Sequence, residues 1–563
     1  MKRKVIALTM TAIMIASLGA CGGGSGADES SKAAENYENP ENLDDLDYDF
    51  GEGETFHSDE PVTYSMLFSD HENYPYKEDW RLWSAIEEKT NVTFDLTLVA
   101  RTDYNDKVST LVNSGDAPWI IPKTYDASNY VDSGQIVPIS DWVQYMPNYM
   151  KCVEEWGMEE ELKTTYQSDG KYYRLPGMWE VAAGGYSLII RKDVFEAAGV
   201  NVEELEKNWT WDDFYEALLK VKEYTGADYV WSDQYQLGST MNISGCQYQI
   251  KAGNSTDGGD WGLKNGTKFD WDKNEFYFTN TTENYREYLR MWNKMYTNGI
   301  IDPETFSQDS NQAQAKFFRG ESYVLNANYQ QLADIQSSGK MQVDGAELYM
   351  IVYPGGPEGH LQVETSRLEN GIMISQSALD ELGEEGFVKM LRFIDWLWYS
   401  DEGLMLSQWG VEGETYTLDE EGNVVLNSDI YYNGINPGAS KQLNVDYGFG
   451  GGVFAYGGSE WLRFSKFTDA EKDWNERVLA NTEPQKLDPP IMADDMEKEE
   501  MSLIEGPLMD YVNQSALQFI TGDLDIENDW DEYVAQCEAK GSQDYIDQAN
   551  EIFENTKDIL GME

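Results

Sequence analysis

The sequence predicts an α/β fold divided into two lobes. From residue 61 onward, segments with strand-like alternation are followed by segments with helical spacing, an order typical of a mostly parallel sheet covered by helices. The chain has 563 residues, 41% of them hydrophobic, which is too long for one compact core. These observations predict two lobes, each built around its own sheet.

The first lobe begins with a strand, a helix and a second strand. Val62–Phe68 and Val92–Val99 alternate between apolar and polar residues, and Trp80–Asn91 between them has helical spacing. A further helix at Tyr104–Asn113 leads into the apolar Trp119–Ile121, which predicts the next strand.

Two later helices have recognisable start and stop residues. Thr210 with Asp213 three positions on predicts a capped start, and Gly226 predicts its end. A second helix is expected over Thr282–Asn298, followed by Gly299 as a stop. Their apolar faces indicate packing rather than ligand binding.

The N-terminus predicts export. Lys2, Arg3 and Lys4 precede a short apolar run that ends at Leu18-Gly19-Ala20-Cys21, a pattern that resembles a bacterial lipoprotein signal. We therefore expect a signal peptide over residues 1–20, lipidation of Cys21 and a flexible tether over 21–60, which place the protein on the extracytoplasmic face of the cell membrane. A plain signal peptide with an incidental cysteine is the alternative.

Charge and cysteine content exclude several functions. The formal net charge of -61 repels nucleic acid and anionic membrane surfaces. Beyond Cys21, the chain has Cys152, Cys246 and Cys537, an odd number without metal-ligand spacing. Isolated buried thiols are expected, although one pair could form a disulfide.

No catalytic, metal or cofactor site is predicted. The chain lacks a nucleophile elbow, a phosphate-binding loop and a His-Glu-x-x-His motif, and it has only three histidines. Asp270–Asn274 begins like a calcium loop, but Glu275 stands where Gly is needed, so a hairpin tip is the preferred interpretation. With 102 Asp and Glu, a glycosidase-like pair of carboxylates could be drawn almost anywhere and has no diagnostic value.

A series of short motifs, in order, resembles the extracellular solute-binding proteins of ABC importers, in particular the large lipoproteins assigned to carbohydrates. The motifs are Asn113–Pro118, Gly170–Pro176, Ile190–Gly199, Trp209–Phe214, Asn298–Glu304, Phe317–Glu321 and Phe393–Gly403. Trp119 departs from the family, which usually has Asp there, as does Asn208, where Pro is frequent.

The resemblance implies a two-lobe, periplasmic-binding-protein-like fold of type II, with discontinuous lobes joined by a hinge. It suggests chain crossings near Leu175–Trp179, Leu325–Asn328 and Arg367–Ile372. The implied division is 61–177 in the first lobe, 178–326 in the second, 327–370 in the first again, and 371–563 in the second with the C-terminal helices. The implied function is capture of an oligosaccharide by a monomer and its delivery to membrane permease subunits.

Sugars require aromatic planes for their C–H faces and acceptors for their hydroxyls, and we expect such residues in loops beyond strand ends. The candidates from the first lobe and first crossing are Asp70, Lys123, Thr124, Trp179, Glu180 and Tyr186. Those further along are Asn326, Asn328, Tyr329, Trp409 and Glu412, with Trp409 the leading candidate. His71 is interpreted as a solvated side chain.

Two other functions remain open. A peptide or another solute could fill the same architecture, because lobes do not fix the ligand. A surface glycan hydrolase or a scaffold lipoprotein would instead require turnover or a stable protein partner.

Overall fold

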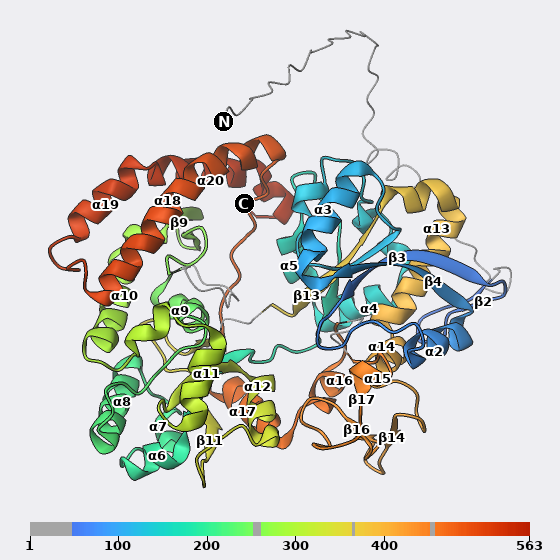
Figure 1. Cartoon of the computed structure of the whole chain (residues 1–563). Helices are drawn as coiled ribbons and strands as arrows, with labels where there is room; N and C mark the ends of the chain where they lie inside the picture. Colours follow the sequence, from blue (N-terminus) through green and yellow to red (C-terminus); the bar gives the residue numbers. More distant parts are fainter. Residues whose placement is uncertain (1–47, 251–260, 363–365, 451–455, 563) are drawn as a thin grey trace, which may run out of the picture.

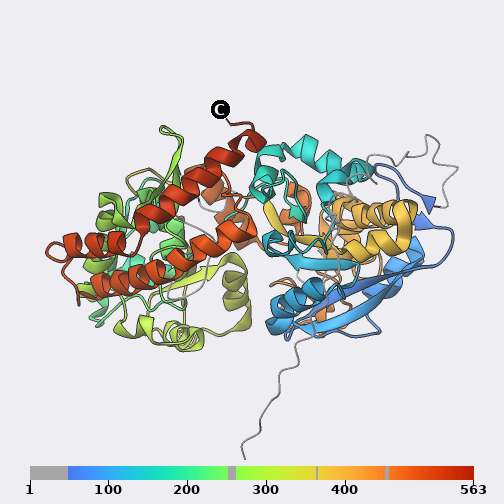
Figure 2. The same ribbon diagram turned by 90° about the horizontal axis from the view of Figure 1, so that it is seen from above.

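Two sheets, each inside its own body of helices, organise the chain (Figures 1 and 2). The computed structural model describes residues 48–250, 261–362, 366–450 and 456–562. The predicted signal peptide and the lipidated Cys21 lie outside the described residues. The α/β class and the two lobes are confirmed.

The first lobe contains a five-stranded sheet in the order β4-β3-β5-β13-β6. Its strands are β3 (Val62–Asp70), β4 (Val92–Ala100), β5 (Ile120–Thr124), β6 (Leu175–Met178) and β13 (Leu368–Ile374). β3 is parallel to β4 and β5, whereas β13 is antiparallel to both β5 and β6. The predicted strands at 62–68, 92–99 and 119–121 are confirmed, in a sheet of mixed direction.

Helices cover this sheet and complete the first core. They are α2 (Arg81–Thr90), α3 (Tyr104–Ser114), α4 (Pro147–Trp156), α5 (Glu159–Leu162), α13 (Gln376–Tyr399), α14 (Asp401–Trp409), α15 (Leu443–Asp446) and α16 (Glu460–Ser465). Short strands complete the lobe: β14 (Tyr416–Leu418), β15 (Val424–Leu426), β16 (Ile430–Tyr431) and β17 (Lys441–Gln442). The predicted helices at 80–91 and 104–113 correspond to α2 and α3. Gly115 ends α3 in the left-handed conformation, which a residue without a side chain adopts at little cost.

The second lobe contains an antiparallel sheet in the order β10-β7-β11. Its strands are β7 (Tyr186–Arg191), β10 (Val324–Asn328) and β11 (Leu348–Met350), and the hairpin β8 (Thr267–Asp270)–β9 (Glu275–Phe278) lies apart from them. Its helices are α6 (Lys192–Ala197), α7 (Val202–Leu205), α8 (Trp211–Thr225), α9 (Gly238–Gly245), α10 (Glu283–Thr297), α11 (Ser310–Arg319), α12 (Tyr329–Ser338), α17 (Asp469–Asn481), α18 (Asp495–Thr521), α19 (Trp530–Ala539) and α20 (Ser542–Thr556).

The predicted caps of the second lobe are present. Thr210 and Asp213 form a reciprocal capping box at the start of α8, and Gly226 ends the helix in the left-handed conformation. Thr282 caps α10 through its hydroxyl, which accepts the amide hydrogen of Tyr285. Local chemistry alone therefore determined these boundaries.

The chain passes between the lobes three times. It crosses from β6 to β7, returns between β12 (Leu361–Gln362) and β13, and crosses again from α16 to α17. The three segments are hydrogen-bonded where they meet: Trp179 N donates to Arg367 O at 2.9 Å, Glu180 N to Gly458 O at 3.1 Å and Gly458 N to Met178 O at 2.8 Å. Gly457 has a φ of +117°, and a Cβ there would lie 2.6 Å from the Met178 carbonyl oxygen, so this close approach requires glycine.

The packing differs from the predicted division after residue 326. β10 does not cross, because it pairs along its whole length with β7, and α12 and β11 then pack in the second lobe. The segment from β13 through α14 packs in the first core instead. A buried strand has the same sequence pattern whether it crosses or stays in a sheet, which explains the difference.

The last part of the predicted tether is folded. β1 (Tyr48–Asp49) pairs with β2 (His57–Ser58), and Phe50 and Phe56 are buried in the first core. The Phe56 ring meets Phe393 of α13 edge to face, with centroids 5.7 Å apart. Residues 48–60 therefore belong to the first lobe, and the expectation of a tether up to residue 60 is wrong for this segment.

Two smaller expectations have clear outcomes in the described residues. Asp270 begins the β8–β9 turn, where its carboxylate accepts the amide hydrogens of Asp272 and Lys273, as expected for a hairpin tip. Cys152, Cys246 and Cys537 are buried and unpaired, and burial raises the pKa of each thiol to about 12. No helix in the described part of the chain is both long enough and apolar enough to span a bilayer.

Candidate functional site

The candidate site lies at the edge of the first sheet where β4, β3 and β5 end. Asp70, the last residue of β3, pairs with Ala100 at the end of β4, and Thr124 ends β5 beside them. β6 is parallel to β5, because both are antiparallel to β13, so Trp179 emerges at this same edge. Ligands of open α/β sheets bind beyond such carboxyl ends.

Aromatic rings gather at this carboxyl edge. His71 stacks on Tyr74 with centroids 4.2 Å apart and planes 20° from parallel. Tyr125 follows β5 and is 70% exposed, and its hydroxyl accepts a long bond of 3.5 Å from the Asn370 amide. Flat, partly exposed rings beside amide groups suit the C–H faces and hydroxyls of a sugar.

Three predicted residues, Asp70, Lys123 and Thr124, reach this edge with different roles. Asp70 accepts the amide hydrogen of Tyr76 at 2.7 Å. Lys123 has a φ of +56°, and its burial, with the nearby Arg101 charge, lowers its pKa to about 8. Thr124 is buried and its hydroxyl donates to Ile121 O at 3.0 Å, so this side chain shapes the turn.

At the first crossing, Trp179 is buried and surrounded by charge. Its indole Nε1 donates to the Glu369 carboxylate at 3.1 Å. The Arg463 guanidinium carbon and the Lys466 Nζ lie 4.8 and 5.0 Å from its ring centroid. Glu180, next along the chain, accepts the amide hydrogen of Glu460 at 2.7 Å and so holds the start of α16.

The second lobe presents a tyrosine and glutamine group at the end of its sheet nearest the crossings. Tyr186 begins β7 and pairs with Asn328, which ends β10. The Tyr186 ring meets Tyr235 edge to face, and the Tyr235 hydroxyl donates to Gln331 at 3.2 Å. These side chains supply donors and acceptors on the second lobe.

The other predicted residues of the second lobe serve its packing or sit at the crossings. Asn328 caps α12 through its side chain, which accepts the Gln331 amide hydrogen. Asn326 is fully buried, and its amide donates to the Thr240 hydroxyl at 2.5 Å. Tyr329 is half-buried, and its ring packs on Phe467 of the third crossing with centroids 4.7 Å apart.

Trp409 and Glu412 are not brought to this site. Trp409 ends α14 with no exposed surface, and its indole donates to the Ser465 hydroxyl at 2.9 Å. Its ring packs edge to face on Tyr432. Trp409 is therefore a core residue in this conformation and its predicted role as a platform is wrong, while Glu412 lies on an exposed loop.

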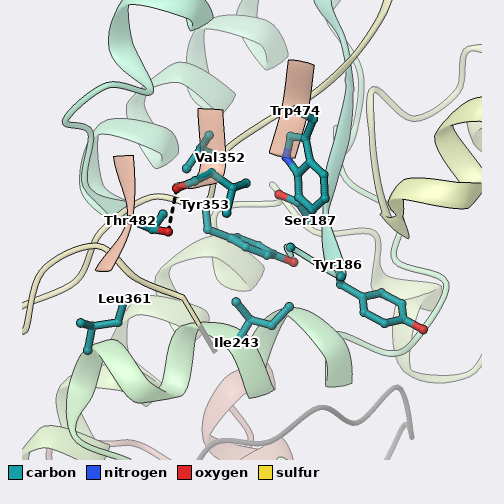
Figure 3. Close-up of a pocket in the computed structure, with 11 residues that line it drawn as sticks. Tyr186, Ser187, Ile243, Val352, Tyr353, Leu361, Trp474 and Thr482 are labelled. Atoms are coloured by element: carbon teal, nitrogen blue, oxygen red, sulfur yellow. Dashed lines mark hydrogen bonds between the residues drawn. The ribbon is translucent and has the colours of Figure 1, made fainter. Parts of the chain in front are cut away.

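A narrow pocket opens behind the second lobe's group (Figure 3). Its walls include Tyr353, Ile243 and Trp474, and the ring of Tyr186 points away from it. The pocket holds about 30 Å³, enough for one or two water molecules and far too little for a sugar ring.

A larger groove lies between the lobes near the C-terminus. A space of about 480 Å³ is lined by Glu160, Glu161, Lys163 and Thr164 of the first lobe and by Trp271, Lys486–Pro490 and Leu560–Met562 of the second. Trp271 also borders a neighbouring groove of about 600 Å³ along the β8–β9 hairpin, and Lys486 lies 3.2 Å over its ring. No group of three or more potential metal-ligating side chains exists in the described ranges.

Sequence reasoning missed several of these side chains. Tyr125 directly follows the predicted Lys123 and Thr124, so its position after a strand was a usable signal. Tyr74 and Tyr235 do not directly follow a predicted strand, and they lie in loops whose course depends on packing. Tyr456, which shares a small cavity with Lys123 and Asn370, follows a glycine-rich stretch that has no periodic pattern.

The sequence profile of bacterial extracellular solute-binding proteins matches residues 82–384, more than half of the chain. The chain belongs to this family. Among solute-binding proteins, the fructooligosaccharide ABC transporter substrate-binding protein FusA of Streptococcus pneumoniae serotype 4 is 24% identical over 528 residues, covering 88% of this chain and 90% of FusA. The polygalacturonan/rhamnogalacturonan-binding protein YtcQ of Bacillus subtilis is 21% identical and covers 84% of this chain and 88% of YtcQ.

A solved structure supports the fold independently. An extracellular solute-binding protein from Bifidobacterium longum subsp. infantis superposes with a TM-score of 0.65 at 14% identity, covering 88% of this chain and 98% of that one. The two-lobe architecture is thus that of known solute-binding proteins.

Proposed function

We propose that this chain is the substrate-binding component of an ABC importer, which captures an oligosaccharide between its two lobes and delivers it to membrane permease subunits. The observation that carries the proposal is the set of rings and polar groups at the carboxyl edge of the first sheet, together with the Tyr186 and Tyr235 group of the second lobe. Membership of the solute-binding family and the glycan ligands named for FusA and YtcQ support it.

The ligand would lie against Tyr125 and the His71–Tyr74 stack on one side. Asp70 and Lys123 would bond its hydroxyls from the first lobe, and Tyr186 and Tyr329 would meet it from the second. Ligand binding would favour the closed arrangement, because a ligand shifts such an equilibrium only by binding one state better.

The proposal includes a lipid anchor at Cys21 and a location on the extracytoplasmic face of the cell membrane. The chain would act as a monomer and catalyse no reaction, and a separate ATPase would drive transport. The lipoprotein-like signal at residues 1–21 and the family's extracellular role support this part of the proposal.

The test is calorimetric titration of the full-length protein with a panel of oligosaccharides, followed by the Tyr125→Ala variant with the best ligand. Loss of one stacking ring should weaken binding about tenfold, or about 1.4 kcal/mol. The fold should be unaffected, since Tyr125 is 70% exposed.

Tyr224→Ala is the matched control, because Tyr224 is 59% exposed on α8 and lies away from the site. Equal affinity of both variants would remove Tyr125 from the site. If peptides bind and no glycan does, the chain would be a peptide-binding protein. If the protein releases products from a glycan, it would be a hydrolase.

A further inference from the structure

Four basic side chains lie along the carboxyl edge of the first sheet in an otherwise strongly acidic protein. The chain has 41 Lys and Arg against 102 Asp and Glu, a net charge of -61. Yet Arg101 follows the end of β4, Lys123 lies at the end of β5, and Arg463 and Lys466 flank Trp179 beyond β6. We refer to these four side chains as the cationic row.

The sheet sets the spacing of the cationic row. Adjacent strands lie about 4.8 Å apart, and the strand order is β4-β3-β5-β13-β6. Arg101 and Lys123 are therefore two strands apart, about 10 Å, and Lys123 is again two strands, about 10 Å, from the Trp179 position. The row runs across the sheet edge rather than forming one point.

Three carboxylates at this edge each accept a hydrogen bond from a backbone amide or an indole. Asp70 accepts from Tyr76 N, Glu180 from Glu460 N and Glu369 from the Trp179 indole. Glu72 is the exception, because it pairs with Arg101 at 3.2 Å. Lys466 donates to the Gln408 side-chain oxygen, a neutral partner.

The environment disfavours positive charge on both lysines of the row. Burial and the Arg101 charge lower the pKa of Lys123 to about 8. Burial and the Arg463 charge lower the pKa of Lys466 to about 7, although Glu369 acts in the opposite direction. An anionic group bound beside them would reverse this effect, because an opposite charge favours the protonated form.

We infer that the ligand is an acidic oligosaccharide whose sugar carboxylates bind along the cationic row, with Lys123 and Lys466 as the main contacts. This inference rests on the proposed function and names its substrate class. Tyr74 and Tyr125 lie close to Arg101 at this edge, so ring faces and carboxylates of one sugar chain would both find partners. The acidic remainder of the surface would reject polyanions elsewhere.

The test compares two ligands that differ only in charge. Tetragalacturonate and the same tetrasaccharide with its carboxyl groups reduced to alcohols are titrated into the full-length protein. We expect the acidic form to bind at least tenfold more tightly. Lys123→Gln and Lys466→Gln should each weaken its binding at least tenfold, while Lys123→Arg should retain most of it.

Lys220→Gln, on the exposed face of α8, is the control and should leave both affinities unchanged. Equal or tighter binding of the reduced ligand, or unchanged affinity in both Gln variants, would overturn the inference. If neutral glycans of any class bind and acidic ones do not, the inference fails and the proposed function stands. If no glycan binds at all, both fail.

Discussion

Deleting residues 48–60 should strongly destabilise the first lobe. This segment contributes Phe50 and Phe56, which are 1% and 0% exposed, to the core beside Phe393. Truncating one buried phenylalanine to alanine costs about 3–5 kcal/mol. Since the two rings contact each other at 5.9 Å, their losses should add incompletely, to about 6 kcal/mol.

Such a loss is comparable to the whole stability of a typical domain, about 5–15 kcal/mol. The assay is urea unfolding of the full-length protein monitored by tryptophan fluorescence, with thermal unfolding measured separately by differential scanning calorimetry. Phe56→Ala should lower the free energy of unfolding of the first lobe by about 4 kcal/mol, and the deletion should lower this free energy further. Deletion of residues 28–40, of equal length within the expected tether, is the control.

The opposite result would be an unfolding curve that neither deletion changes. That result would mean that residues 48–60 form a tether after all and that Phe50 and Phe56 contribute nothing to the core. A lowered midpoint only in the 48–60 deletion would support the packing described above.

Two further predictions concern the core and the crossings. Trp409→Ala should lower the free energy of unfolding by about 3–5 kcal/mol, because the Trp409 ring is fully buried. The folded fraction of this variant should bind ligand with unchanged affinity. A large loss of affinity without a loss of stability would instead place Trp409 in the binding site. In the folded state, burial and the Arg463 charge lower the pKa of Lys466 to about 7. From about pH 7 to pH 10, the unfolded state therefore binds more protons than the folded state. Because of this difference, Lys466 increases the free energy of unfolding as pH rises through that range. The free energy of unfolding, measured at several pH values, should therefore rise more steeply with pH in the wild type than in Lys466→Met. Parallel curves for the two proteins would contradict the lowered pKa of Lys466.

Most of the fold could be predicted because its information is local. Alternation identified β3 and β4, and the Thr210 capping box identified the start of α8. The assignment of β10 failed because pairing partners are non-local, and a short buried strand does not reveal which sheet receives it. Phe50 and Phe56 were missed because two apolar residues in an acidic stretch do not form a periodic pattern.

The candidate site was less predictable for a related reason. Asp70 and Lys123 were found because strand ends can be read from the sequence. Trp409 was misplaced because it ends a helix whose face is buried, and the local sequence does not show which element packs on that face. The stacking of His71 on Tyr74 depends on the turn after β3, which propensity does not determine.

The hydrogen bonds among the three crossing segments limit how the lobes can move. Sliding one segment along another would break bonds between peptide groups at Trp179, Arg367 and Gly458, whereas flexing all three together would keep them. The hydrogen-bonded connection therefore permits hinge bending of the three segments together and resists independent movement of any one segment. Under the proposed function, closure would bring the same two surfaces together each time and would present a permease with one reproducible shape.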